Sequence, residues 1–137
     1  MIEDDLFTMA KTIYGECRGE PRLGKIAVGW VIRNRFESGK WFAGPTIEET
    51  CTKPFQFSCF NANDPNLPRL EIVTLGDPVF VECVYVAAGV MCGALPDPTH
   101  GSTHYYAPGS TPSMPKWAVG KDPCYTSGRH KFFKGID

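Results

Sequence analysis

The sequence predicts a mostly helical α+β fold in a single domain, residues 1–137. Apolar residues recur at helical intervals in three stretches of the chain, whereas short extended segments are expected only toward its C-terminal end. The 137 residues, of which 42% are hydrophobic and 12% aromatic, are enough to bury one core. No internal repeat and no linker composition interrupts the chain, so we expect its elements to pack together.

The first helix is expected over Asp4–Cys17. Its apolar residues recur at helical spacing and form one stripe: Leu6, Met9, Ala10, Ile13 and Cys17. Glu16 follows Ile13 by three positions, so its side chain is expected at the margin of this stripe. A carboxyl group that is partly shielded from water there can still reach a groove and donate a proton. Glu16 is therefore a candidate general acid, although a solvated glutamate in a last helical turn has the same sequence pattern.

The second helix is expected to start after Pro21 and to end near Gly39, because proline is favoured in a first helical turn and glycine just beyond a last one. The third should begin at Asp77, a good cap, with Pro78 in its first turn, and should stop at Gly93. The small apolar residues of this third helix indicate that it is largely buried.

Residues 41–68 are expected to form a long irregular region, and such loops in compact domains are often binding loops. Within it, Gln56 and Ser58 alternate with three apolar residues: Phe55, Phe57 and Cys59. In an extended segment, the amide and the hydroxyl would face one side and the apolar groups the other. This arrangement is typical of a sugar-binding groove. A loop pinned to the core by its phenylalanines predicts the same spacing equally well.

Two extended segments are expected, at residues 103–107 and 131–133. The first contains His104, Tyr105 and Tyr106 in succession. Neighbouring side chains of an extended segment point to opposite sides, so one tyrosine can enter the core while the other lines a groove. A single histidine is more often a structural hydrogen-bonding residue than a catalyst.

Glu20 lies four positions after Glu16, so the two carboxylates could share one side of a helix. An inverting glycosidase needs an acid and a base on opposite sides of a sugar ring, which two parallel side chains do not easily provide. Because Glu20 immediately precedes Pro21, we expect it to act at the N-terminal end of the second helix.

Composition argues against several other classes. The net charge is −1 and the basic residues are scattered, so no nucleic-acid partner is implied. The six cysteines show no zinc-site spacing, which argues against a structural metal. Cys51 and Cys59 flank a short loop and are the easiest pair to imagine bridged, while free buried thiols are the default for most of the six.

Two alternative functions stay open on the residues alone. A cysteine peptidase or amidase would use Cys59 with one of the histidines, but no clear helix follows Cys59 to activate its thiol. A non-enzymatic glycan-binding module would use Trp41, Trp117 and the tyrosines as stacking surfaces, and would leave Glu16 without a role.

Five segments carry motifs that follow one another at suitable spacing: Ala10–Pro21, Gly24–Arg35, Gln56–Ser58, Thr103–Tyr106 and Gly128–Phe133. Together they resemble the cell-wall hydrolase family typified by the SleB and CwlJ spore-cortex-lytic enzymes, over nearly the whole chain. The resemblance implies a lysozyme-like fold. It also implies cleavage of the β-1,4 bond between N-acetylmuramic acid and N-acetylglucosamine in peptidoglycan, without a metal or cofactor.

In that family, the first glutamate of a Gly-Glu-x-x-Gly-Glu motif is the catalytic acid and base, and Glu16 occupies this position here. The resemblance implies a lytic transglycosylase that forms 1,6-anhydro-N-acetylmuramic acid. A muramidase that uses the same glutamate and water stays open. The candidate substrate-binding residues are Gln56, Phe57, Ser58, His104, Tyr105 and Tyr106. The residues with structural roles in the motifs are Glu20, Asn34 and His130.

We expect peptidoglycan glycan strands as the binding partner, no stable membrane insertion and a monomer. The acidic start of the chain does not resemble a secretory signal peptide. It therefore predicts synthesis in a bacterial host cytoplasm and action on the wall after release. A phage endolysin, or a hydrolase associated with the virion, fits this expectation.

Overall fold

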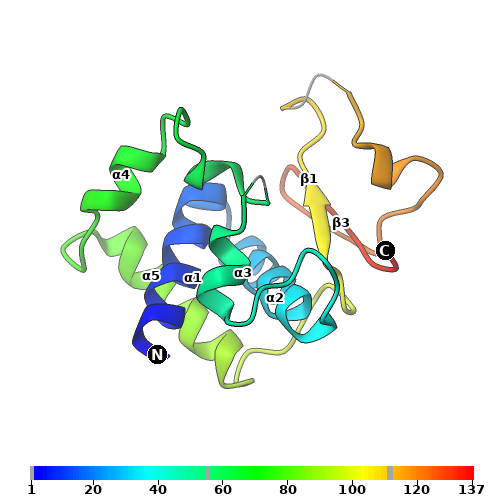
Figure 1. Cartoon of the computed structure of the whole chain (residues 1–137). Coiled ribbons are helices and arrows are strands. Elements are labelled where there is room, and N and C mark those ends of the chain that lie inside the picture. Colours follow the sequence, from blue (N-terminus) through cyan, green and yellow to red (C-terminus); the bar gives the residue numbers. More distant parts are fainter. Residues whose placement is uncertain (1, 55, 111–112) are drawn as a thin grey trace.

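The computed structural model describes residues 2–54, 56–110 and 113–137. Its helices form one body, with a small sheet beside the end of α2 (Figure 1). The longer helices are α1 (Ile2–Cys17), α2 (Arg22–Ser38) and α5 (Pro78–Met91). The expected α+β, mostly helical fold is confirmed. Phe55, which belongs to the expected alternating segment, lies outside the described residues.

The main core lies between α1, α2 and α5. Met9, Ala10, Ile13 and Cys17 of α1 are buried, which confirms the predicted stripe. Helix α2 approaches α5 closely at Gly29, because a Cβ atom there would lie only 3.1 Å from a methyl carbon of Val90. The helix ends agree with the expectations: the Asp77 side chain accepts a hydrogen bond from the Val79 amide, and Gly39 adopts a left-handed conformation.

The region expected to be irregular contains two short helices, α3 (Ile47–Thr52) and α4 (Leu67–Ile72), and a 3₁₀ turn at Ser58–Phe60. Thr46 caps α3 by accepting a hydrogen bond from the amide of Glu49 at 3.0 Å. Neither short helix is predicted from the sequence, because six residues are too few to show a helical period.

The sheet has the order β1-β3-β2 and is antiparallel throughout. Its strands are β1 (His104–Tyr106), β2 (Tyr125–Ser127) and β3 (His130–Phe133). Phe132 joins the main core, whereas Phe133 packs with Ala118 and Ile136 in a second, smaller cluster. The sheet therefore separates two apolar clusters, and a 3₁₀ turn at Lys116–Ala118 closes the smaller one. Strand β2 was not expected from the sequence.

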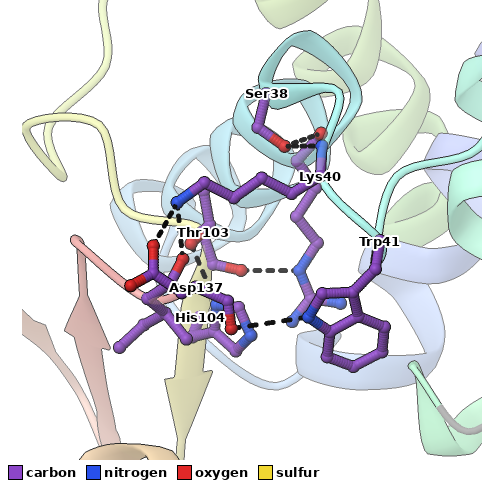
Figure 2. A network of polar contacts seen from close by, with 8 residues as sticks. Ser38, Lys40, Trp41, Thr103, His104 and Asp137 are labelled. Carbon is purple, nitrogen blue, oxygen red and sulfur yellow. Dashed lines mark hydrogen bonds and ion pairs between the residues drawn. The ribbon is translucent and has the colours of Figure 1, made fainter.

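Polar contacts fasten the sheet region to the end of α2 (Figure 2). The Lys40 ammonium donates to the carbonyl of Ile136 at 2.9 Å and lies 3.2 Å from the Asp137 carboxylate. The Trp41 indole N–H donates to the carbonyl of Asp137 at 3.4 Å. The carbonyl of Thr103, next to β1, accepts from a guanidinium on α2. These contacts fix β1 relative to the helices.

All six cysteines are free. Cys51 and Cys59 are both buried and unbridged, so the suggested pairing is wrong, while the expectation of free thiols is confirmed. Across residues 2–54, 56–110 and 113–137, no helix combines the length and the apolar character needed to cross a bilayer.

Candidate active site

Glu16 lies in the last turn of α1, and residues from two distant segments hold its carboxylate. Its Oε1 accepts a hydrogen bond from the Tyr105 hydroxyl on β1 at 2.5 Å. Its Oε2 accepts from the Cys59 amide at 3.3 Å and, over 3.4 Å, from the Ser58 hydroxyl. The expected position at the edge of the apolar face agrees with the half-buried side chain.

Tyr105 donates to Glu16 and does not accept from it. Burial, together with the negative charge of Glu16, raises the pKa of Tyr105 well above its ordinary value. The phenol therefore keeps its proton near neutral pH. A hydrogen bond between such a donor and a carboxylate is short and strong.

A groove of about 480 Å³ opens beside Glu16. Four of the predicted substrate-binding residues line it: Gln56, Ser58, Tyr105 and Tyr106. The other lining residues, apart from Glu16, are Arg35, Asn61, Ala107, Ser110 and His130. Amide, hydroxyl and aromatic groups in one concave surface suit a carbohydrate. Among the described residues that line the groove, Glu16 carries the single carboxylate.

Tyr105 and Tyr106 point to opposite faces of β1, as expected for neighbours in a strand. Tyr105 packs against the main core, whereas the ring of Tyr106 stacks on Phe133 with their centroids 5.7 Å apart. Both nevertheless reach the groove. This placement agrees with the prediction of both tyrosines as substrate-binding residues, although one of the two also packs against the core.

Phe57 and His104 do not line the groove, so their prediction as substrate-binding residues is wrong. Phe57 is 2% exposed and belongs to the main core. His104 is 5% exposed and lies edge-on between the rings of Phe42 and Trp117, with centroids 4.8 and 4.9 Å away. Neighbouring side chains point in opposite directions in extended segments. Gln56 and Ser58 therefore face the groove where Phe57 faces the interior, and Tyr105 faces the groove where His104 faces the interior.

Arg35, Asn61, Ala107 and Ser110 line the groove but were not predicted from the sequence, and Arg35 is the charged residue among them. It lies on the buried face of α2, where it is 5% exposed. One of its terminal nitrogens donates to the Gln56 side-chain oxygen at 3.2 Å, and its Nε donates to the carbonyl of Thr103. Its guanidinium carbon lies 4.7 Å from the centre of the Phe57 ring. Arg35 thus orients the Gln56 amide, and an arginine among the mostly apolar residues of a helix face was the available signal.

Glu20 does not cap α2, contrary to expectation. Its carboxylate accepts from the backbone amide of Arg129 at 3.2 Å, in the turn between β2 and β3. The same oxygen lies 3.2 Å from Nδ1 of His130. This distance is short enough for an ion pair, but the two groups are not aligned for a hydrogen bond. Burial lowers the pKa of His130, and the Glu20 carboxylate opposes this shift only in part. Glu20 therefore ties the α1–α2 junction to the hairpin beside the groove.

Asn34 holds a loop in place. Its side-chain amide donates to the Asp97 carboxylate and to the carbonyl of Ser102, each at 3.0 Å. Burial raises the pKa of Asp97, but hydrogen bonds from Thr99, Asn34 and a loop amide outweigh this effect and lower it. The loop before β1 is thereby fixed, which agrees with the structural role expected for Asn34.

The model of a known protein family matches residues 19–133, most of the chain, and its description is cell wall hydrolase. The chain belongs to the cell wall hydrolase family. The match begins after Glu16, so the role of Glu16 rests on geometry and motif rather than on the family model.

Spore cortex-lytic enzymes are among the relatives of this family member. Those of Halalkalibacterium halodurans and Bacillus cereus are each 28% identical to it, over 95% and 96% of this chain. The chain spans only 34% and 45% of the lengths of these two relatives.

Two solved structures resemble this cell wall hydrolase closely, each with 26% identity over 96% of the chain. The catalytic domain of the germination-specific lytic transglycosylase SleB from Bacillus anthracis gives a TM-score of 0.73 over 95% of its length. The catalytic domain of the Bacillus cereus SleB protein gives 0.70 over 91%. The expected lysozyme-like fold is confirmed by this likeness. The assignment of residues 1–137 to one catalytic domain stays a prediction.

The Cys59 thiol of this cell wall hydrolase is poorly suited to act as a nucleophile. It is fully buried, and burial together with the nearby Glu16 charge raises its pKa far above the ordinary value. The reactive thiolate is therefore scarce. Within the ranges that the structure describes, no cluster of three or more histidine, cysteine or acidic residues is arranged to hold a metal ion.

Proposed function

We propose that this chain cleaves the β-1,4 bond between N-acetylmuramic acid and N-acetylglucosamine in peptidoglycan, with Glu16 as the catalytic residue. The observation that carries the proposal is the Glu16 carboxylate, half-buried and held by Tyr105, at the edge of a polar and aromatic groove. The cell wall hydrolase family and the SleB catalytic domains support the same reaction class.

The reaction needs one group that first gives and then takes a proton. Protonated Glu16 donates its proton to the glycosidic oxygen as the bond from that oxygen to C1 of the muramyl residue breaks. The resulting Glu16 carboxylate then removes the proton of the C6 hydroxyl, and that oxygen bonds to C1. The products are a new free hydroxyl on N-acetylglucosamine and a 1,6-anhydro ring, and Glu16 ends protonated as it began.

A single carboxylate favours this route over simple hydrolysis. A retaining or inverting glycosidase uses two carboxyl groups, roughly 5–9.5 Å apart. Glu20 is the other acidic residue near Glu16 in the chain, and contacts with the hairpin engage its carboxylate. A muramidase reaction with water as the acceptor is the second candidate, because it can use the same Glu16.

Mass spectrometry of fragments released from purified peptidoglycan tests the proposal. The wild-type protein is expected to release anhydro products, lighter by one water than hydrolysis products, and Glu16→Gln is expected to release none. Reducing-end products would instead assign a muramidase. Retention of more than a few per cent of wild-type turnover by Glu16→Gln would refute the role of Glu16.

The same experiment separates the two other classes. Binding to peptidoglycan with no released fragment from the wild type would indicate a non-catalytic module. Loss of activity with a thiol alkylator, together with indifference to Glu16→Gln, would indicate the cysteine enzyme. The phage-endolysin role, release from a host cytoplasm and the monomeric state stay predictions from the sequence.

A further inference from the structure

Glu16 also borders a second hollow, which shares no other lining residue with the groove. This hollow measures about 290 Å³ and is lined by the end of α1, by Asn66 and by Arg129 in the hairpin turn. Glu16 is the residue that lines both hollows. A glycan strand that is cut at Glu16 must extend past this residue in both directions. The second hollow is therefore positioned to hold the sugar on one side of the bond that is cut.

Two guanidinium groups give this hollow a positive character. Arg18 is half-buried, and its stem is fixed because one terminal nitrogen donates to the carbonyl of Tyr14 at 3.3 Å while the guanidinium lies over the Tyr14 ring. Arg129 is exposed and projects from the turn between β2 and β3. Within the described part of the chain, neither side chain forms an ion pair with an acidic residue.

Three other arginines, all on α2, already have partners. Arg22 lies 3.3 Å from Glu82, and Arg33 lies 3.3 Å from Glu37. Arg35, the arginine of the groove, is buried and donates to Gln56 and Thr103. The two hollows on either side of Glu16 therefore differ in chemistry. The groove offers amide, hydroxyl and aromatic groups, and the second hollow offers two guanidinium groups with donors to spare.

We propose that Arg18 and Arg129 bind a carboxylate of the peptide stem on a muramyl residue. This inference rests on the proposed function. In peptidoglycan, muramyl residues alternate with N-acetylglucosamine, and only the muramyl residue carries a lactyl-linked peptide with carboxylates. Arginine suits this ligand because its planar fork matches a carboxylate with two parallel hydrogen bonds. A charged hollow on one side of Glu16 then fixes the direction in which the strand lies in the site.

The experiment compares soluble glycan strands with the same strands after carbodiimide coupling has converted their carboxylates to neutral amides. Cleavage is measured as kcat/KM for both substrates. Binding is measured separately, by fluorescence anisotropy of labelled strands, in the Glu16→Gln background. The test variant is Arg18→Met with Arg129→Met, which keeps the aliphatic stem of each side chain. The matched control is Lys121→Met with Lys134→Met, which removes the same charge at residues that line neither hollow.

The parent protein is expected to prefer the native strands by about five- to tenfold, since two partly exposed ion pairs contribute an effect of this order. The arginine variant should bring this ratio close to one, and the lysine control should keep it. An unchanged ratio in the arginine variant, or an equal fall in the lysine control, overturns the proposal. If no strand is cleaved but the binding preference depends on the arginines, the proposed function fails and the binding site stands.

Discussion

The Tyr105 hydroxyl makes the shortest of the contacts to Glu16, at 2.5 Å against 3.3 and 3.4 Å for the other two donors. It also stays a donor near neutral pH, because burial and the Glu16 charge raise its pKa. A single side chain thus sets both the direction of the Glu16 carboxylate and the polarity of the hydrogen bond.

Replacing Tyr105 by phenylalanine is expected to lower kcat by about 10- to 100-fold, since hydrogen bonds to charged groups contribute roughly 1.5–3 kcal/mol. The ring stays in place, so the melting temperature should fall only slightly. Steady-state kinetics and a thermal melt on the same sample check this. Tyr125→Phe is the control because Tyr125 lies in the same sheet, on β2 at the far side of β3, and does not line the groove. Equal losses in both variants would contradict a specific role for Tyr105.

The protonation of His104 affects the stability of the whole fold. Burial, with the charges of Arg35 and Lys40, lowers its pKa to about 4. Between about pH 4 and the ordinary value near 6.5, the unfolded chain binds a proton at this site and the folded chain does not. Stability therefore falls as the pH drops from 6.5 to 4, by up to about 1.4 kcal/mol per pH unit for one such group. His130, whose pKa is also lowered, acts in the same direction.

Denaturant unfolding at pH 7, 6, 5 and 4 is the measurement for this prediction. His104→Phe keeps an aromatic ring between Phe42 and Trp117 and should flatten the pH dependence of the free energy of unfolding. His100→Asn, at an exposed position with a φ of 57° that asparagine tolerates, should leave it unchanged. A parallel slope in wild type and His104→Phe would show that His104 is not the titrating group.

At the scale of elements, the junction between α1 and α2 is joined to the β2–β3 hairpin through Glu20. The hairpin turns at Gly128 with a φ of +54°, and a Cβ atom there would lie 2.5 Å from the Glu20 carboxylate. Glycine is therefore needed for the backbone conformation and for the approach of the carboxylate. This contact holds one wall of the groove against the helix that carries Glu16.

Glu20→Gln is expected to lower the free energy of unfolding by about 1–2 kcal/mol, because a partly buried charged hydrogen bond to the Arg129 amide is weakened. Turnover of the folded protein should stay near that of the wild type. Chemical denaturation and initial rates provide the two readouts, and Glu71→Gln, at an exposed position, is the control. Unchanged stability with abolished turnover would exchange the roles of Glu16 and Glu20.

At the scale of the whole molecule, the six free thiols differ in how far they are buried. Cys92 is exposed and Cys124 is half-buried, while the remaining four are enclosed in the main core. Burial raises the pKa of Cys51 to about 12, and likewise that of Cys83, which further slows their reaction with alkylating reagents.

Alkylation followed by mass spectrometry is expected to modify Cys92 rapidly, Cys124 slowly and the other four only after denaturation. Unfolding without a reducing agent should release all six thiols. Recovery of four thiols under these conditions would show that a disulfide, such as Cys51–Cys59, forms in solution. The exposed Cys92 serves as the internal control for reagent activity.

Helical periodicity predicted the three long helices and the marginal position of Glu16, because each helix is long enough to show which face is apolar. The alternation of Gln56 and Ser58 with apolar residues predicted two groove residues, although Ser58 begins a 3₁₀ turn and does not lie in the extended segment that the alternation assumed. Phe57 and His104 were assigned to the groove on motif membership alone, and the structure places both in the interior. The groove position of Arg35 and the hydrogen bond between Glu20 and the hairpin could not be predicted. Both depend on contacts between residues more than 20 positions apart, which no local sequence pattern contains.

The three donors to the Glu16 carboxylate stand 42, 43 and 89 positions further along the chain. No short segment of the protein can therefore orient this group, and the site exists only once α1, the 3₁₀ turn and β1 have all docked. Recovery of enzymatic turnover during refolding would report the last of these docking events. Helical circular dichroism, to which α1, α2 and α5 contribute most of the signal, can return earlier.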